Sequence, residues 1–289
     1  MKITGLHLLL SYQCTLECDH CFTWGSPWQS GTMDLDTVRH MLRQAQDADT
    51  VQGIYFEGGE PFLYYPILLA GVREASATGF ETGIVTNSYW ATTVKDAEAW
   101  LRPFVGVLGS LSVSSDLYHW NERLGLQARN AQAAAEKLGI PLGFLSIAQP
   151  GEQGEGESAI MYRGRASEKL IDRAVHQPWE QFAECPYENL RDPGRLHVDP
   201  FGHMHICQGI SIGNLLQASL GEISMAFKPE IHPITGPLID GGPAELVRRY
   251  GLAHEERYAD ACHLCYEARR CLRSRYPEIL TPDQMYGIA

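Results

Sequence analysis

The most constraining feature of this 289-residue chain is a cluster of three cysteines after an apolar, strand-like run at residues 3–10, namely Cys14, Cys18 and Cys21. The spacing is CxxxCxxC, and the next cysteine is Cys185. Because a protein-held four-iron cluster normally takes four thiolates, a trio predicts a cubane with one iron that lacks a protein ligand. An open coordination position is typical of catalytic metal sites. The alternatives are a zinc site and chance clustering.

A second motif, GGEP, follows another strand-like run and consists of Gly58, Gly59, Glu60 and Pro61. Glycine and proline together often mark an ordinary turn, which is the alternative interpretation. Two adjacent glycines also let a backbone come close to a ligand, so that its carbonyl groups can accept hydrogen bonds from an ammonium group. We therefore treat this motif as a candidate ligand-binding turn.

The two motifs together resemble the radical SAM superfamily, in which CxxxCxxC follows the first strand and GGEP follows the second. His20 stands where that family has an aromatic residue before the third cysteine. The resemblance implies a [4Fe-4S] cluster on the three cysteines, whose open iron binds the amino and carboxylate groups of S-adenosylmethionine (SAM). It further implies that one electron cleaves SAM to a 5′-deoxyadenosyl radical, with His20 and the GGEP residues binding the cofactor.

The overall composition narrows the class of protein. A formal net charge of −12 argues against a broad nucleic-acid interface. The sequence contains no run of 18 apolar residues that would predict a membrane span, and its first ten residues are not followed by a signal-peptide cleavage site. Eight cysteines in such a chain indicate metal binding in a reducing cytoplasm rather than disulfides.

Strand-like and helix-like segments alternate through the first part of the chain. Such alternation predicts an α/β fold with a parallel sheet and right-handed crossovers. Six strand–helix units are fewer than the eight of a closed barrel, and the resemblance implies a partial (β/α)6 TIM-type barrel. We expect the barrel over 1–180 and a cysteine-rich extension over 181–289. The expected strands are 3–10, 53–56, 81–86, 105–113, 142–148 and 158–163, and the expected helices are 34–45, 64–78, 94–102, 120–138 and 168–176.

Polar residues at the expected strand ends are further candidates, because α/β folds place their chemistry there. The resemblance implies contacts to SAM from Asn87 and Ser114, after the third and fourth strands. The segment MYRGRA resembles a stretch of the auxiliary-cluster subgroup, which makes Arg163 or Arg165 a candidate for the SAM carboxylate or ribose. A capping or surface role is the alternative for each. The residues Asp116, Tyr118 and His119 are weaker candidates that could line a substrate pocket or merely cap and pack.

Five further cysteines follow the expected barrel, namely Cys185, Cys207, Cys262, Cys265 and Cys271. The segment before Cys207 predicts a β-hairpin with Gly202 at its tip. This order resembles the twitch/SPASM extension and implies one auxiliary [4Fe-4S] cluster on the first four of these cysteines. The chain departs from the full SPASM pattern because Arg275 stands where another cysteine would follow. Cys271 is left over as a reactive thiol, an alternative ligand or a small buried hydrophobe. A four-cysteine zinc site is the alternative.

These features predict a radical SAM enzyme whose 5′-deoxyadenosyl radical abstracts hydrogen from a substrate carbon. The auxiliary cluster would support a net oxidation or the formation of a C–C or C–S bond, and a flavodoxin or ferredoxin would supply the reducing electron. Because the barrel is expected to begin at residue 3, without an N-terminal leader-binding domain, we favour a small-molecule substrate. A peptide-modifying maturase is the alternative, and a non-catalytic iron–sulfur electron carrier is the alternative from another class.

Overall fold

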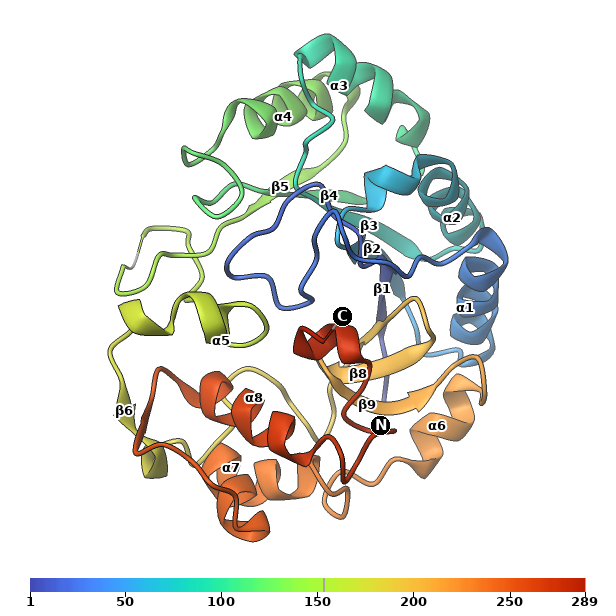
Figure 1. Cartoon of the computed structure of the whole chain (residues 1–289). Coiled ribbons are helices and arrows are strands. Elements are labelled where there is room, and N and C mark those ends of the chain that lie inside the picture. Colours follow the sequence, from blue (N-terminus) through green and yellow to red (C-terminus); the bar gives the residue numbers. More distant parts are fainter. Residues whose placement is uncertain (153, 289) are drawn as a thin grey trace.

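An eight-stranded sheet forms the centre of the computed structural model, which describes residues 1–152 and 154–288 (Figure 1). The strand order is β5-β4-β3-β2-β1-β7-β8-β9. Strands β1 to β5 and β7 pair in parallel, whereas β8 and β9 run antiparallel to their neighbours. The strands are β1 (Gly5–Ser11), β2 (Gly53–Gly58), β3 (Glu81–Thr86), β4 (Ser110–Ser114), β5 (Leu142–Leu145), β7 (Arg195–Val198), β8 (His203–Cys207) and β9 (Ile210–Asn214).

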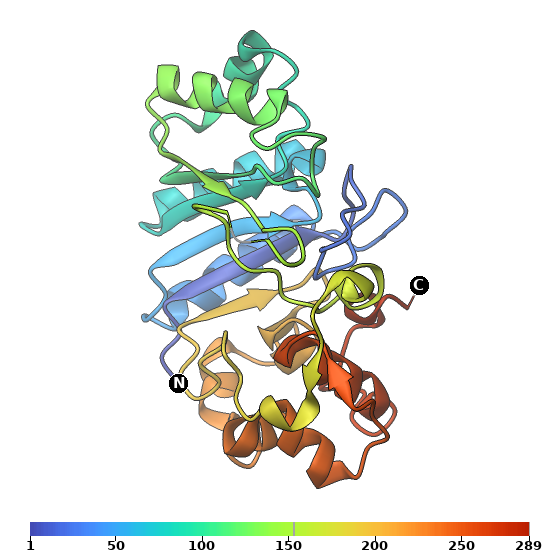
Figure 2. The ribbon, with the colours of Figure 1, turned by 90° about the vertical axis from the view of Figure 1, so that its left-hand side faces the viewer.

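The first four helices connect strands β1 to β5 and lie on the outer side of the curved sheet (Figures 1 and 2), and the other helices belong to the second half of the chain. The helices are α1 (Leu35–Asp47), α2 (Tyr65–Ala77), α3 (Val94–Leu101), α4 (Leu126–Leu138), α5 (Ala166–Lys169), α6 (Leu220–Ala226), α7 (Thr235–Tyr250) and α8 (Ala261–Leu272). Short 3-10 turns occur at Pro61–Tyr64, Arg102–Phe104, Ile171–Arg173, Trp179–Gln181 and Asp283–Tyr286. A separate antiparallel pair joins β6 (Gln177–Pro178) to β10 (Arg257–Tyr258).

The predicted start of α1 and the predicted end of α4 are confirmed, and both have a local cause. The side chain of Asp34 accepts a hydrogen bond from the backbone N–H of Thr37 at 2.7 Å and so caps α1. The buried face of α1 repeats at helical spacing, through Val38, Met41, Leu42 and Ala45. Helix α4 ends at Gly139, whose φ of 67° is the left-handed conformation that glycine adopts at little cost.

The predicted sixth strand at 158–163 is wrong. Within the described residues, that segment forms only an isolated bridge between Ile147 and Ser158. The backbone N–H of Tyr162 instead donates to the Asp260 carboxylate at 3.2 Å, near the start of α8. The position beside β1 is filled by β7, which comes from the cysteine-rich half of the chain. The sheet therefore contains five strands from the first half and three from the second.

Several predicted boundaries also differ from the structure. Strand β4 begins only at Ser110, because 3-10 and turn residues precede it. Strand β5 ends at Leu145, and α4 begins at Leu126 after a turn around Asp116. The helix predicted at 168–176 is two short pieces, α5 and a 3-10 turn.

The two halves of the chain share one sheet and one apolar core. Leu6 and Leu8 of β1 belong to the same buried cluster as Leu196 and Val198 of β7. The hydroxyl of Tyr12 donates to the buried carboxylate of Asp199 at 2.9 Å across the same junction. The division into domains at residue 180 stays a prediction. Among the described residues, no helix has the length and apolarity needed to cross a membrane.

Candidate functional site

The loop after β1 holds Cys14, Cys18 and Cys21 and projects from the carboxyl end of the central strands (Figure 2). Burial raises the pKa of Cys14 to about 12, and charges on Glu60 and Cys21 add to the effect. Burial also raises the pKa of Cys18, with contributions from Cys21 and Cys14. These thiols therefore lie close together and stay protonated at neutral pH. A bound metal reverses this, because coordination deprotonates a thiol.

Arg165 fixes the backbone of the cysteine loop. Its guanidinium donates to the carbonyl of Cys18 at 2.7 Å and to that of Gly25 at 2.9 Å. Its own backbone N–H donates to the carbonyl of Cys21 at 2.9 Å. The side chain of Arg165 is only 3% exposed, and two of its N–H groups donate hydrogen bonds to this loop. The structure thus places Arg165 behind the loop as a support, and a contact to SAM stays a prediction.

The distances between the cysteine sulfurs distinguish a zinc site from an iron–sulfur cluster site. A tetrahedral zinc ion with Zn–S bonds of about 2.3 Å holds its sulfurs about 3.8 Å apart. Among the described residues, neither the first trio nor the later cysteines have three sulfurs that all lie within 4.8 Å of one another. A four-iron cubane binds each thiolate at a separate iron and so spreads the sulfurs further. The described sulfurs are therefore not gathered around a single-ion position, and the auxiliary cubane stays a prediction.

The GGEP motif lies against the cysteine loop. The backbone N–H groups of Gly59 and Glu60 donate to the carbonyls of Ser11 and Gln13 at 2.6 Å and 2.9 Å. A Cβ atom at Gly59 would lie 2.1 Å from the carbonyl oxygen of Gln13, so any side chain would push the two segments apart. The two glycines are therefore required by this close approach of backbones. A direct contact from Gly58, Gly59 or Pro61 to SAM stays a prediction.

Glu60 points into the protein and links the segments that follow β2 and β3. Its carboxylate is fully buried and accepts hydrogen bonds from the backbone of Phe62 at 3.0 Å, the backbone of Asn87 at 2.8 Å and the hydroxyl of Thr86 at 2.8 Å. Burial raises the pKa of Glu60 to about 7, although these hydrogen bonds act in the opposite direction. The contacts give Glu60 a structural role at the junction of β2 and β3.

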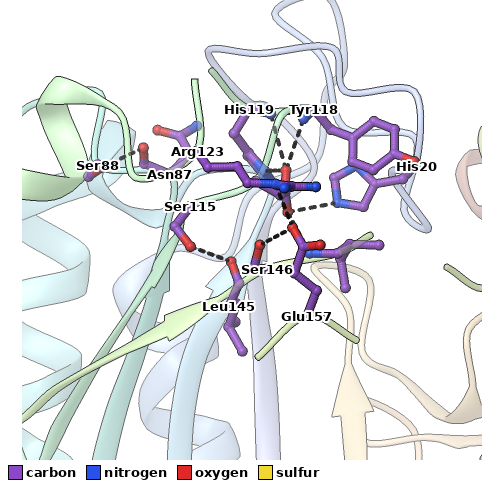
Figure 3. Close-up of polar contacts among 12 residues, drawn as sticks. His20, Asn87, Ser88, Ser115, Tyr118, His119, Arg123, Leu145, Ser146 and Glu157 are labelled. Atoms are coloured by element: carbon purple, nitrogen blue, oxygen red, sulfur yellow. Dashed lines mark hydrogen bonds and ion pairs between the residues drawn. The ribbon is translucent and has the colours of Figure 1, made fainter. Parts of the chain in front are cut away.

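A polar group around Asp116 lies beside the cysteine loop (Figure 3). The Asp116 carboxylate accepts from the backbone N–H of Tyr118 at 3.1 Å and from Nδ1 of His119 at 2.7 Å. The His20 ring stacks on Tyr118 with a centroid distance of 4.5 Å, and its Nε2 lies 3.9 Å from Asp116. Burial lowers the pKa of His20 to about 4, so its imidazole is neutral. The predicted candidates His20, Tyr118 and His119 thus form one group.

The predicted strand-end residues lie near this group. Asn87 follows β3, and its amide donates to the sulfur of Cys14 at 3.5 Å and to the hydroxyl of Thr15 at 3.0 Å. Ser114 is the buried last residue of β4, and the neighbouring Ser115 donates to the carbonyl of Leu145 at 3.4 Å (Figure 3). Asn87 therefore touches the cysteine loop directly. Binding of SAM by Asn87 and Ser114 stays a prediction.

The predicted second set of cysteines lines a single pocket, and its members are Cys185, Cys207, Cys262 and Cys265. They come from the loop before β7, from the end of β8 and from α8. Arg163 enters this pocket, where its Nη1 lies 3.1 Å from the sulfur of Cys207. The structure thus brings the four cysteines together with Arg163, whose guanidinium also lies 5.8 Å from the ring centroid of Phe22 in the first cysteine loop; its contact to SAM stays a prediction.

The sequence model of the radical SAM superfamily matches residues 8–155, which is slightly more than half of the chain. The match includes both the CxxxCxxC loop and the GGEP motif. This chain belongs to the radical SAM superfamily. It is therefore an enzyme of that superfamily, and the family implies a [4Fe-4S] cluster and SAM as cofactors.

Individual relatives match only parts of this radical SAM protein. YydG of Bacillus subtilis (strain 168), whose name assigns it to peptide biosynthesis, is 26% identical over 38% of this chain and 35% of its own length. A tungsten-containing aldehyde ferredoxin oxidoreductase cofactor-modifying protein of Pyrococcus furiosus is 36% identical over 28% of this chain and 23% of its own length. The chain therefore spans about a third or less of these relatives. BtrN, solved with AdoMet and 2-DOIA, covers 76% of this chain and 81% of itself, with 14% identity and a TM-score of 0.49.

Cys271 lies apart from both cysteine sets of this radical SAM protein. It is exposed near the end of α8 and lines a different pocket, together with His263 and Glu267. The prediction of a small buried hydrophobe is therefore wrong for this residue, because its position on α8 faces outward. The other two interpretations, a reactive thiol and an alternative ligand, stay predictions.

Sequence reasoning missed a polar trio on the inner face of the barrel, formed by His7, Glu57 and His197 from three adjacent strands. Their ligand atoms all lie within 4.8 Å of one another, and Nε2 of His197 is 3.5 Å from the Glu57 carboxylate. Burial lowers the pKa of His197 to about 3. His7 pairs in register with His197, so the missing signal was the partnership of β1 and β7, which local sequence does not reveal.

Proposed function

We propose that Cys14, Cys18 and Cys21 bind a [4Fe-4S] cluster whose fourth iron binds SAM. When bound, this cluster supplies one electron that cleaves SAM to methionine and a 5′-deoxyadenosyl radical, which then takes a hydrogen atom from a substrate carbon. The observation that carries the proposal is the cysteine loop held directly against the GGEP turn, with Cys14 and Cys18 buried and Cys21 partly exposed. The four cysteines of the later pocket come from other elements, which leaves three thiolates for the first cluster.

The chain's own residues would prepare this site for SAM. The Asn87 amide and the backbone of Gly59 fix the loop on one side, and Arg165 fixes it on the other. The neutral ring of His20, stacked on Tyr118, offers a flat surface beside the third cysteine. A flat aromatic surface suits the adenine of SAM. Ser114 and Pro61 complete the group of residues that we propose to contact the cofactor.

We further propose an auxiliary [4Fe-4S] cluster on the later pocket's four cysteines. Burial raises the pKa of Cys265 to about 12, and it also raises the pKa of Cys185 and Cys262. Such thiols are costly to ionise without a metal and are readily deprotonated by one. The auxiliary cluster would accept one electron from the substrate radical, which would make the overall reaction an oxidation. A separate flavodoxin or ferredoxin would reduce the first cluster.

The substrate would reach the inner face of the barrel, where the polar trio lies. The edge of Phe22 faces His197 with ring centroids 6.2 Å apart, so this trio is next to the cysteine loop. The Glu57 carboxylate and the imidazoles of His7 and His197 suit a substrate with hydroxyl or amine donors. We therefore favour a small polar molecule. A peptide is the second candidate, which the name of the relative YydG favours.

The decisive experiment is anaerobic. Reconstituted protein is reduced with dithionite, mixed with SAM and assayed for 5′-deoxyadenosine by liquid chromatography. We expect product from the wild-type chain and none from a Cys14→Ala/Cys18→Ala/Cys21→Ala variant. An intact cluster without product would favour the electron-carrier alternative. Metal analysis separates the zinc alternative, because two cubanes bring about eight irons per chain.

A further inference from the structure

The segment Arg163-Gly164-Arg165 connects the two cysteine sites. Its first side chain reaches the sulfur of Cys207 at 3.1 Å, and its third reaches the carbonyl of Cys18 at 2.7 Å. Between them, Gly164 adopts a φ of 59° and lies against the backbone of the cysteine loop. The two arginine side chains therefore point in opposite directions, and this one short segment contacts both cysteine sites.

Arg163 is a buried cation with an unusual set of partners. It is 6% exposed, and its Nη1 lies 3.1 Å from the Cys207 sulfur and 3.5 Å from the Glu188 carboxylate. Within the part of the chain that the structure describes, its Nε has no hydrogen-bond partner. A buried guanidinium is costly unless negative charge surrounds it. One carboxylate supplies part of that charge, and ionised cysteines would supply the rest.

A second buried guanidinium lies on the other side of the same pocket. Arg269 is 1% exposed and also lines the pocket, and its Nη1 donates to the carbonyl of Gln208 at 2.6 Å. This contact binds Arg269 to a backbone oxygen, whereas Arg163 points directly at a cysteine sulfur. Arg269 also lowers the pKa of Cys265 and so adds positive charge on its side of the pocket, while Arg163 makes the hydrogen bond to the Cys207 sulfur.

We propose that Arg163 is a positioning residue that raises the reduction potential of the auxiliary cluster through its hydrogen bond to Cys207. This inference rests on the auxiliary cluster of the proposed function. Hydrogen bonds to ligand sulfurs and the net charge around a cluster set its potential. A cation at the sulfur stabilises the reduced state, which carries one more negative charge. The step concerned is the entry of one electron, which comes from the substrate radical, and no bond to iron forms or breaks.

The test uses the full chain with Cys14→Ala, Cys18→Ala and Cys21→Ala, so that only the auxiliary cluster remains. Reductive titration followed by electron paramagnetic resonance then gives its midpoint potential. Arg163→Gln should make reduction about tenfold less favourable, which is about 59 mV for a one-electron couple. Arg163→Lys keeps the charge but not the planar donor, so its midpoint potential should fall between those of the Arg163 protein and the Arg163→Gln variant. Arg165→Gln, the matched control, should leave this potential unchanged.

Each result has a distinct meaning. About four irons per chain and an unchanged potential in Arg163→Gln would overturn the inference and leave the proposed auxiliary cluster intact. No iron in the background protein would overturn both the auxiliary cluster and the inference. If Arg163→Gln alone loses its iron, its potential cannot be measured, and the midpoint potential of the Glu188→Gln variant tests the inference instead. Removing the carboxylate opposite Arg163 should shift the potential upward, and a constant or lower potential would overturn the inference.

Discussion

At Gly164 the chain passes so close to the cysteine loop that no side chain fits. A Cβ atom there would lie 2.6 Å from the carbonyl oxygen of Cys21 and 2.6 Å from the Cα of Phe22. Its φ of 59° also belongs to the left-handed region that favours glycine. The residue is therefore fixed by two independent constraints, one of conformation and one of space.

The variants Gly164→Ala and Gly139→Ala distinguish the cost of the left-handed conformation from the cost of the missing space. Gly139 has a φ of 67°, but a Cβ atom added there would meet nothing within 4 Å, so alanine should cost only the conformational term of about 1–2 kcal/mol. Gly164→Ala should cost more and should also reduce the iron bound by the first cysteine trio. Urea unfolding and iron analysis of both variants check this. Equal iron contents would show that the segment does not support the loop.

The buried carboxylate of Glu60 carries a second prediction at this scale. Glu60→Gln keeps the shape but replaces one oxygen by an NH2 group, which must face either the donors on Phe62 and Thr86 or the backbone N–H of Asn87. The hydroxyl of Thr86 cannot adapt without loss, because its oxygen already accepts from Ser88 and Trp90. We expect a loss of about 1–3 kcal/mol in the free energy of unfolding. The exposed Glu81→Gln should change it by less than about 0.5 kcal/mol, and an equally small effect at Glu60 would contradict this account.

At the scale of elements, local sequence predicts the parts that local forces fix. The cap at Asp34 and the stop at Gly139 both follow from short-range patterns. The loop formed by residues 158–163 does not follow from such patterns, because the alternating residues of this segment also suit a strand. Its position depends on a distant contact instead, because the backbone N–H of Tyr162 donates to the carboxylate of Asp260, 98 positions away.

Helix α7 offers a prediction about pH. His232 precedes it, and its Nδ1 accepts from the backbone N–H of Thr235 at 3.1 Å and of Ile234 at 3.3 Å. Burial lowers the pKa of His232 to about 4, below the value near 6.5 of an unfolded histidine. Its contribution to stability is therefore complete above pH 6.5 and is lost as pH falls from there toward 4.

His232→Asn keeps an acceptor for the first turn of α7 but does not titrate. Between pH 7.5 and 5.5, the wild-type chain should lose about 1 kcal/mol more unfolding free energy than the variant, since each pKa unit is worth about 1.4 kcal/mol. Urea unfolding at both pH values measures the difference. An identical loss in the two proteins would mean that His232 titrates normally when folded.

For the molecule as a whole, the sequence predicts which cysteines form two groups but not how the groups are joined. The spacing of Cys14, Cys18 and Cys21 and the predicted hairpin before Cys207 were sufficient for the grouping. The position of Arg163 was not predictable, because two arginines of one turn diverge toward different sites. The trio of His7, Glu57 and His197 also depends on strands that only the folded chain brings together.

Because β7 to β9 complete the central sheet, we predict that residues 1–180 do not fold alone. The fragment would lack Leu196, Val198, Met204, Ile206 and Ile210, which share a buried cluster with β1. Burial of each such side chain contributes about 1.5–3 kcal/mol, so five of them approach the entire stability of a typical domain. The fragment would also expose the edge of β1, which promotes aggregation. We expect an insoluble or unfolded fragment by circular dichroism, whereas the full chain unfolds in one transition. A soluble fragment with cooperative unfolding would instead make residue 180 a true domain boundary.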